Sequence, residues 1–214
     1  MWDPRRPAAP ARLGRVDLHL YKLLNGLAYR HDAIEDPFRF FAVEAQVLFI
    51  GLLAVLFVAR GKWRSVNGRR GVVAAGLSAA LALGAAHVIS HLWERPRPYL
   101  AHPDGAHLFI PASHDPSFPS DHATAAFAIA VALLLRHRKA GVLALAMALV
   151  VSVARVAVGT HYPGDIVGGA VLGTLAALAL WTPPLRRLLD AVADRAAALY
   201  DALVAGALAR VRPA

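Results

Sequence analysis

The chain has 214 residues, of which 57% are hydrophobic and 17% are charged, and it contains no cysteine. Its mean hydropathy of +0.48 is too high for a soluble domain of this length, which indicates an integral membrane protein. The lack of cysteine excludes disulfides and thiolate metal sites. The net charge of +9 comes from basic residues clustered between apolar runs, so it indicates anionic lipid headgroups as partners and not nucleic acid.

The N-terminal region contains one predicted helix. Residues 1–12 are rich in Pro, Arg and Ala without periodicity, which predicts a disordered segment. Residues 13–30 carry leucines at mostly helical spacing with charges between them. This pattern predicts an amphipathic helix at the membrane interface. The alternative is a helix that packs on the membrane bundle.

Five apolar segments follow, each near the roughly 20 residues that a helix needs to cross a bilayer. The third is the shortest, and it crosses only if its polar start enters the membrane. We therefore predict an all-α fold, an integral membrane helical bundle of about five to six helices. Residues 13–182 form the membrane domain and 183–214 an amphipathic tail on the membrane surface. The predicted spans are Phe40–Ala59, Gly71–Trp93, His122–Leu135, Ala140–Ala157 and Asp165–Trp181.

Gly169 and Gly173 form a G-x-x-x-G pattern in the last predicted span. Small residues at this spacing let two helices approach closely. Because the whole chain is rich in alanine and glycine, close packing inside the bundle is favoured over a dimer interface. A homo-oligomer is compatible with the sequence, but nothing in it indicates one.

The number of crossings sorts the loops onto two sides. The loops at 93–121 and 156–164 are separated by two crossings, so they lie on one side, and the loops at 60–70 and 136–139 lie on the other. The second pair is rich in Arg and Lys, and short basic loops stay in the cytoplasm. The first pair is therefore predicted to face outward from the plasma membrane. Five crossings also place the basic N-terminus outside, which conflicts with the same rule.

Three stretches on the predicted outer side carry ionisable residues at membrane edges, where such groups are costly and by default mark functional sites. Arg97 and Arg155 are forked cations suited to bidentate phosphate contacts. Ser120 and Asp121 lie where a loop enters a helix, whose free N–H groups bind anions. The stretches are E-R-P-R-P at 94–98, F-P-S-D-H-A-T at 118–124 and A-R-V-A-V-G-T-H-Y-P-G-D at 154–165.

Two histidines and a carboxylate complete the predicted site. Asp165 follows His161 by four residues across a Pro-Gly turn. We expect Asp165 to accept a hydrogen bond from one ring nitrogen, which leaves the other nitrogen free to attack phosphorus. His122 is the candidate general acid on the leaving oxygen. The pattern lacks a cluster of carboxylates for two metal ions, which disfavours metal-assisted hydrolysis, and no metal or cofactor is predicted.

The motifs R-P-R-P, P-S-D-H and R-x5-H-x3-D, in this order and between spans, resemble the type 2 phosphatidic acid phosphatase superfamily of membrane lipid phosphatases. The resemblance covers roughly residues 87–169 and implies a metal-independent phosphohistidine mechanism. The stretches L-Y-K-L-L-N-G-L-A and F-F-A-V-E are similar to the N-terminal part of bacterial undecaprenyl-diphosphate phosphatases. That subgroup implies regeneration of a polyprenyl carrier for cell-wall assembly.

Two positions depart from the family pattern. The usual lysine seven positions before Arg97 is Ser90 here, and the usual serine of the third motif is Ala154. His87 lies three residues before the position of the missing lysine, and His91 lies one residue after it. Each is a candidate replacement cation or, alternatively, a hydrogen-bonded residue of the bundle.

Two further ionisable residues have open roles, and so does the substrate. Arg95 is either a second phosphate ligand or a headgroup anchor, and Glu44 is either a partner for a cation of the site or an interfacial carboxylate. The favoured function is hydrolysis of a polyprenyl diphosphate to the monophosphate. The alternatives are a phosphatidate, phosphatidylglycerophosphate or decaprenyl-phosphosugar phosphatase. A rival of another class is a non-catalytic lipid-phosphate binder or transporter, which the missing lysine supports.

Overall fold

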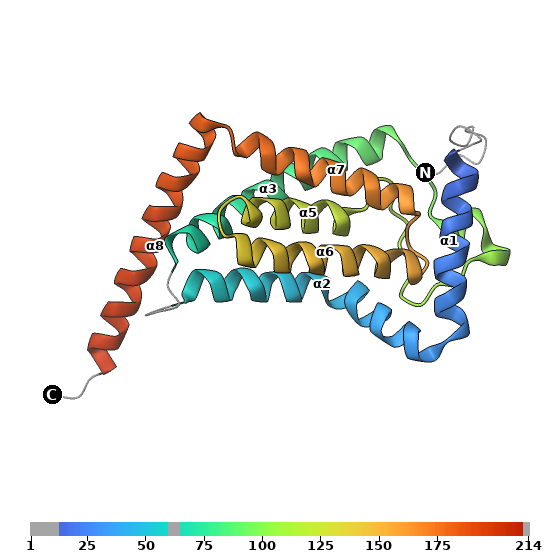
Figure 1. The fold of residues 1–214 in the computed structure, drawn as a ribbon, viewed down its shortest axis with the longest axis horizontal. Helices are drawn as coiled ribbons and strands as arrows, with labels where there is room; N and C mark the ends of the chain where they lie inside the picture. The colour runs from blue at the N-terminus through green and yellow to red at the C-terminus, as the bar shows by residue number, and fades with distance from the viewer. Residues whose placement is uncertain (1–12, 60–64, 212–214) are drawn as a thin grey trace.

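The computed structural model describes residues 13–59 and 65–211, and within these ranges the chain forms helices and no strand (Figure 1). The all-α prediction is therefore confirmed, while the predicted disordered segment 1–12 lies outside the described residues. The elements are α1 (Leu13–Arg30), α2 (Asp32–Val58), α3 (Val66–Leu92), α4 (Pro98–Ala101), the 3₁₀ helix η2 (Pro103–Gly105), α5 (Asp121–Leu134), α6 (Arg138–Ala157), α7 (Pro163–Leu180) and α8 (Pro183–Val211).

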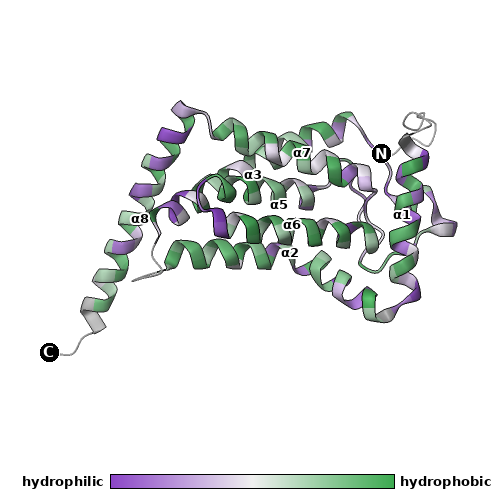
Figure 2. Cartoon of the chain, in the orientation of Figure 1, coloured by the Kyte–Doolittle hydropathy of each residue, from purple (hydrophilic) through white to green (hydrophobic). Residues whose placement is uncertain are grey.

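Helices α2, α3, α5, α6 and α7 run side by side as a bundle, with α5 packed against α3, α6 and α7 (Figure 1). α2, α3, α6 and α7 are long and apolar enough to cross a membrane, as predicted, and hydrophobic residues dominate them (Figure 2). α5 has 14 residues, which at about 1.5 Å per residue is shorter than a bilayer core. Its neighbours cover much of its surface, so α5 contacts protein more than lipid.

α5 and α7 approach closely because α7 has glycine where the two helices meet. A Cβ atom at Gly169 would lie 2.7 Å from the carbonyl oxygen of Ser120, and one at Gly173 would lie 2.2 Å from that of Thr124. No side chain fits at such backbone contacts. The G-x-x-x-G pattern therefore packs inside the bundle, as predicted, and the alternative of a dimer interface through these glycines is wrong.

α1 lies across one end of the bundle (Figure 1) and contacts α2, α6 and α7. Tyr21 is fully buried there, packed with Val156 and Tyr162. The helix thus packs on the bundle, as the alternative interpretation expected. Its other side exposes apolar side chains, so a position at the membrane interface stays a prediction. The exposed residues include Val16, Leu20, Leu23 and Leu27.

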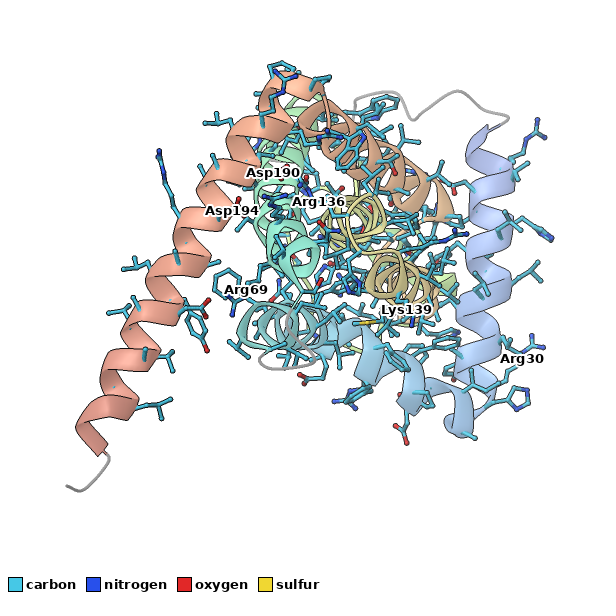
Figure 3. All side chains as sticks on the ribbon, turned by 60° about the vertical axis from the view of Figure 1, so that its left-hand side comes forward. Arg30, Arg69, Arg136, Lys139, Asp190 and Asp194 are labelled. Carbon is cyan, nitrogen blue, oxygen red and sulfur yellow. The ribbon has the colours of Figure 1, made fainter. Side chains whose placement is uncertain are left out.

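α8 crosses the opposite end of the bundle (Figure 1) and packs on α3. Its carboxylates pair with arginines at the start of α3 and in the turn before α6, and Figure 3 shows Asp190 and Asp194 on the side of α8 that faces the bundle. A C-terminal helix is thus present, as predicted, while its amphipathic character and its contact with the membrane surface stay predictions. The ion pairs are Arg69–Asp201 at 2.8 Å, Arg70–Asp194 at 2.7 Å and Arg136–Asp190.

The loops that carry the predicted site residues meet at the α1 end of the bundle. The backbone N–H of Ser117 donates to the carbonyl of Arg95 at 2.8 Å, and that of Ser120 donates to the carbonyl of Asp165 at 3.1 Å. These bonds join the loop before α5 to the segment before α4 and to the first turn of α7. The loops therefore lie on one side of the bundle, as the number of crossings predicted.

Candidate active site

A cavity of about 580 Å³ opens between α2, α3 and α5 at the end of the bundle where these loops meet. This volume is in the range of sites for small molecules. One part of its wall is polar and comes from the loops, the start of α5 and the end of α6. The other part is apolar and comes from the helices; it includes Ala45, Phe49, Ile50, Leu53, Leu83 and Ile129.

The structure brings most of the predicted site residues to this cavity. Ser120 and Asp165 do not line it, and both are fully buried behind its wall. Asp115, which the sequence analysis did not select, also lines it. The predicted residues on the cavity wall are Arg97, Asp121, His122, Arg155 and His161.

His161 is held by the backbone of Ser117. Its Nδ1 lies 2.9 Å from the Ser117 carbonyl oxygen and 3.8 Å from Oδ2 of Asp165, and the second distance is too long for a hydrogen bond. The predicted hydrogen bond from His161 to Asp165 is therefore wrong, because the carbonyl takes that position. Since a carbonyl only accepts, Nδ1 carries the proton. Nε2 keeps its lone pair and lies 3.3 Å from Nη1 of Arg97.

Burial keeps the His161 ring neutral. The residue is 2% exposed, and this burial lowers the pKa of His161 to about 4; the charges of Arg155 and Arg97 act in the same direction, and the carboxylate of Asp165 opposes them. At neutral pH the imidazole is therefore unprotonated at Nε2. Because this nitrogen belongs to a ring on the cavity wall, it can serve as a nucleophile or a base.

Asp165 acts on the histidine through a neighbour. Its carboxylate accepts from Arg95 Nη1 at 2.6 Å, from Ser117 Oγ at 2.5 Å and from the backbone N–H of Tyr162 at 2.9 Å. Asp165 thus fixes Ser117, whose carbonyl in turn holds His161. A buried carboxylate with charge-assisted bonds of this kind orders the loop around it.

Two guanidinium groups lie at the polar end of the cavity. Arg97 is 7% exposed, and it donates from Nε to the carbonyl of Asp115 at 2.9 Å and from Nη1 to that of Thr160 at 3.2 Å. Arg155 donates from Nη1 to the carbonyl of Ala42 at 3.3 Å, and its buried Nε has no hydrogen-bond partner among the described residues. An unpaired buried donor on a cation is costly, so this end of the cavity suits an anion.

The start of α5 brings His122 to the cavity. The helix begins at Asp121 after the N-cap residue Ser120, and its first-turn N–H groups lie at the same end of the bundle. The Asp121 carboxylate lines the cavity too, beside the two guanidinium groups. The Oγ of Ser120 is buried without a partner among the described residues, and a direct phosphate contact by this hydroxyl stays a prediction.

Arg95 matches neither of its predicted roles. The sequence analysis offered a phosphate ligand or a headgroup anchor, but the guanidinium binds Asp165 through Nη1 and Asp17 of α1 through Nη2 at 2.5 Å. A second arginine in R-P-R-P is the sequence signal that could have indicated such a pair. Ser117 and Asp17 belong to no motif, and sequence reasoning missed both.

The candidate replacements for the missing family lysine do not line the cavity. The Oγ of Ser90 and the Nδ1 of His91 both donate to the carbonyl of His87 at 2.8 Å. His87 and His91 lie against each other, with ring centroids 4.3 Å apart. The structure therefore favours the alternative of a hydrogen-bonded helix residue for His91, and the ring of His87 packs on that of His91. Glu44 is partly buried on α2 and does not line the cavity either.

Comparisons with known proteins point to one family. Residues 71–188 match the PAP2 superfamily. The chain is 30% identical over 189 residues to undecaprenyl-diphosphatase BcrC of Bacillus subtilis (strain 168), an alignment that covers 88% of this chain and 94% of the relative. It is 38% identical over 116 residues to the decaprenylphosphoryl-5-phosphoribose phosphatase of Mycolicibacterium smegmatis, which covers 54% of this chain and 61% of that protein.

A solved structure has the same arrangement of helices. The crystal structure of LpxE from Aquifex aeolicus aligns with 77% of this chain and 93% of its own chain, with a TM-score of 0.63 and 26% sequence identity. The matched family range contains the seven positions that carry the predicted chemistry, together with most of α3 and all of α5, α6 and α7. These positions are Arg97, Ser120, Asp121, His122, Arg155, His161 and Asp165.

Proposed function

The chain belongs to the PAP2 superfamily, and we propose that it is a membrane lipid phosphatase that hydrolyses a polyprenyl diphosphate, such as undecaprenyl diphosphate, to the monophosphate. The observation that carries this proposal is a cavity in which a neutral imidazole and two guanidinium groups lie beside an apolar wall. The polar end suits a phosphate group and the apolar wall suits an isoprenoid chain. The 30% identical relative, an undecaprenyl-diphosphatase, supports this substrate.

In the proposed first step, Nε2 of His161 attacks the terminal phosphorus of the diphosphate. An N–P bond forms and the bond from this phosphorus to the bridging oxygen breaks, with its electron pair going to the oxygen. His122 gives that oxygen a proton, since the negative charge of a bound diphosphate favours the imidazolium form of a nearby histidine. The products of this step are the polyprenyl monophosphate and a phosphohistidine.

In the proposed second step, water releases the phosphate. The neutral His122 takes a proton from a water molecule that attacks phosphorus, and the N–P electron pair returns to Nε2 of His161. Arg97, Arg155 and the N–H groups at the start of α5 hold the equatorial oxygens, where the transition state concentrates charge. Asp165 keeps the imidazole oriented through Ser117.

The proposed mechanism uses no metal ion. Within residues 13–59 and 65–211, no group of three or more His, Cys, Asp or Glu side chains is arranged to hold one. Positive charge at the cavity comes from Arg97 and Arg155, whose planar groups match the oxygens of a phosphate. Activity in the presence of a chelator is the direct test of this part.

We also propose that the cavity opens on the outer side of the plasma membrane. Arg69, Arg70, Arg138 and Lys139 lie at the other end of the bundle, near the starts of α3 and α6. Short basic loops stay in the cytoplasm, which supports a cavity that opens on the outer side. The carboxylates of α8 pair with part of this basic end.

The test is phosphate release by the purified chain in detergent with a chelator present. Farnesyl diphosphate and phosphatidic acid are compared as substrates, for the wild type and for His161→Ala. Chelator-resistant release that favours the diphosphate and disappears in the variant is expected. Preference for phosphatidic acid overturns the prenyl substrate, and loss of activity with chelator overturns the metal-independent mechanism. A folded wild-type chain that releases phosphate from neither lipid supports a binder or transporter instead.

A second candidate substrate is a decaprenyl-linked sugar phosphate. The 38% identity to the decaprenylphosphoryl-5-phosphoribose phosphatase over 116 residues favours it. Both candidates place an isoprenoid chain against the apolar wall, but they differ in the group that leaves: a polyprenyl monophosphate in one and a sugar hydroxyl in the other. A higher kcat/KM for decaprenylphosphoryl-5-phosphoribose than for farnesyl diphosphate would favour this second substrate.

A further inference from the structure

Arg95 lies between two carboxylates that come from different parts of the chain. Its Nη1 donates to Oδ1 of Asp165 at 2.6 Å, and its Nη2 donates to Oδ2 of Asp17 at 2.5 Å. The side chains of Arg95, Asp17 and Asp165 are 17%, 13% and 0% exposed. The guanidinium also lies over the ring of Tyr162, with its carbon 4.0 Å from the ring centroid. This is a largely buried cluster, and its geometry is fixed from several sides.

Asp17 also holds the first turn of α7, which contains Asp165. Its Oδ1 accepts from the backbone N–H of Gly164 at 2.7 Å. A Cβ atom at Gly164 would lie 2.9 Å from Oδ2 of Asp17, so glycine allows this close approach. The side chain of Asp17 thus contacts both Arg95, which binds Asp165, and Gly164, which precedes Asp165 in the chain.

α1 is fixed to the bundle at a second point, two turns further along. Nδ2 of Asn25 donates to the carbonyl of His107 at 2.7 Å and to that of Ala157 at 2.8 Å, and its Oδ1 accepts from the N–H of His107 at 2.9 Å. Asn25 is 1% exposed. Because α1 cannot slide while these bonds hold, the position of Asp17 relative to Asp165 is defined.

The charges of the cluster matter for the proposed chemistry. One guanidinium and two carboxylates leave a net charge of −1 close to His161, whose Nδ1 lies 3.8 Å from Asp165. When Nε2 forms its bond to phosphorus, a ring that keeps the proton on Nδ1 becomes positive. A nearby net negative charge stabilises that ring. Without Asp17, Arg95 and Asp165 would form a neutral pair, and this stabilisation would weaken.

We infer that Asp17 and Arg95 are positioning residues for the reaction at His161. Arg95 binds the carboxylate of Asp165. This carboxylate binds Ser117, whose carbonyl orients the imidazole of His161. Asp17 binds Arg95 and makes the net charge of the cluster negative. The inference rests on the proposed function, since it assigns a task within the same reaction. Asp17 lies outside the range that matches the PAP2 superfamily, so α1 supplies a part of the site that the matched range does not include.

The test compares Asp17→Asn, Arg95→Lys, Arg95→Gln and the double variant Asp17→Asn/Arg95→Gln with the wild type. The control is Arg70→Gln, which breaks the ion pair with Asp194 at the far end of the bundle. For each protein, kcat and KM for farnesyl diphosphate are measured in detergent, together with thermal unfolding and the amount of phosphoenzyme in quenched samples. Asp17→Asn is nearly isosteric and keeps an oxygen for the Gly164 N–H, so it preserves the packing of α1.

We expect Asp17→Asn to lower kcat on the order of tenfold with KM within about twofold of the wild type, because the lost interaction acts on the transition state. Arg95→Gln should lower kcat more, and adding Asp17→Asn to it should cause a smaller loss than Asp17→Asn causes alone, because the part of its effect that passes through Arg95 is already lost. Arg95→Lys should fall between wild type and Arg95→Gln, since lysine keeps the charge without the fork. Phosphoenzyme should form more slowly in each variant, and Arg70→Gln should match the wild type.

Some results would overturn the inference. A folded Asp17→Asn with wild-type kcat, or with a change in KM alone, means that the cluster only docks α1. Losses that multiply in the double variant contradict action through Arg95. If Arg95→Gln does not fold, the kcat values of Asp17→Asn and Arg95→Lys still test whether the two residues position His161. A wild-type chain without phosphatase activity on any lipid phosphate is a failure of the proposed function, and it is recognised as such because the wild type is measured first.

Discussion

Nδ1 of His161 donates to the backbone carbonyl of Ser117 at 2.9 Å, and the Oγ of the same serine donates to Asp165 at 2.5 Å. A single residue thus connects the candidate nucleophile with the buried carboxylate. A backbone carbonyl fixes the ring tautomer as well as a carboxylate does, because both only accept hydrogen bonds. The carboxylate is then free to bind Arg95 and the N–H of Tyr162.

Replacing Ser117 by alanine should lower kcat without changing KM. The variant keeps the carbonyl that binds His161 but loses the bond to Asp165. Hydrogen bonds to charged groups contribute about 1.5–3 kcal/mol, so a loss of roughly ten- to hundredfold in kcat is expected if the bond acts mainly in the transition state. The measurement is steady-state phosphate release from farnesyl diphosphate.

Thr182→Ala is the control for this variant. The Thr182 hydroxyl donates to the carbonyl of Ala179 and is exposed, at the start of α8. The Thr182→Ala variant loses one hydroxyl hydrogen bond far from the cavity, so its kcat should equal that of the wild type. Equal kcat values for Ser117→Ala and Thr182→Ala would show that the bond to Asp165 has no part in catalysis.

The stability of the fold should decrease as the pH falls from about 6.5 to about 4. The pKa of His161 is about 4 in the folded chain and near 6.5 in the unfolded chain, so the unfolded chain binds more protons in this window. The free energy of unfolding therefore rises with pH across the window and is unaffected by this group above it. The full effect is roughly 3 kcal/mol.

The measurement is the midpoint of thermal unfolding in detergent over this pH range, for the wild type and for His161→Gln. Glutamine does not titrate, so the variant should lose less stability than the wild type between neutral and acid pH. The same slope in both proteins would mean that His161 is not buried in its neutral form.

The apolar segments and the glycine pattern were sufficient to predict the bundle. The predicted spans agree with α3, α5, α6 and α7 to within a few residues, and α2 is longer than predicted because it continues through the polar residues 32–39. Helix positions follow from local periodicity. The G-x-x-x-G pattern was interpreted correctly because Gly169 and Gly173 face the backbone of α5.

The contacts within the site were harder to predict than its members. The motifs identified the arginines and histidines on the cavity wall. They predicted Asp165, four residues further along the chain, as the hydrogen-bond partner of His161. Its partner is Ser117, which is 44 residues away. Asp17 and Arg95 are 78 residues apart. Loop conformations depend on such distant contacts, and a single sequence carries no periodic signal for them.

Gly173→Ala should destabilise the fold, whereas Gly76→Ala should not. A Cβ atom at Gly173 would lie 2.2 Å from the carbonyl oxygen of Thr124, and one at Gly76 has nothing within 4 Å. Overpacking of this kind costs about 1–3 kcal/mol or more, while alanine at an open helical position is favourable by roughly 0.5–1 kcal/mol. Thermal unfolding of the two variants in the same detergent checks this. Equal midpoints would contradict the close contact of α5 and α7.

Ile50→Gln should weaken binding of a long isoprenoid substrate. Ile50 lines the apolar part of the cavity, and replacing it by a polar side chain removes contact area for the lipid chain. Burial of such a side chain contributes about 1.5–3 kcal/mol, so KM for undecaprenyl diphosphate should rise on the order of tenfold if substrate and transition state lose the contact equally. The turnover of p-nitrophenyl phosphate, which has no isoprenoid chain, should not change.

Val47→Gln is a closely matched control on the same helix. Val47 is 62% exposed and Ile50 is 66% exposed, but Val47 does not line the cavity. Both variants place a glutamine on an exposed apolar position of α2, so any general effect on membrane insertion or on the detergent complex should be the same. A rise in KM confined to Ile50→Gln therefore assigns the effect to the cavity wall. An equal rise in both variants would mean that the isoprenoid chain lies elsewhere, since only Ile50 of the two can contact a lipid in this cavity.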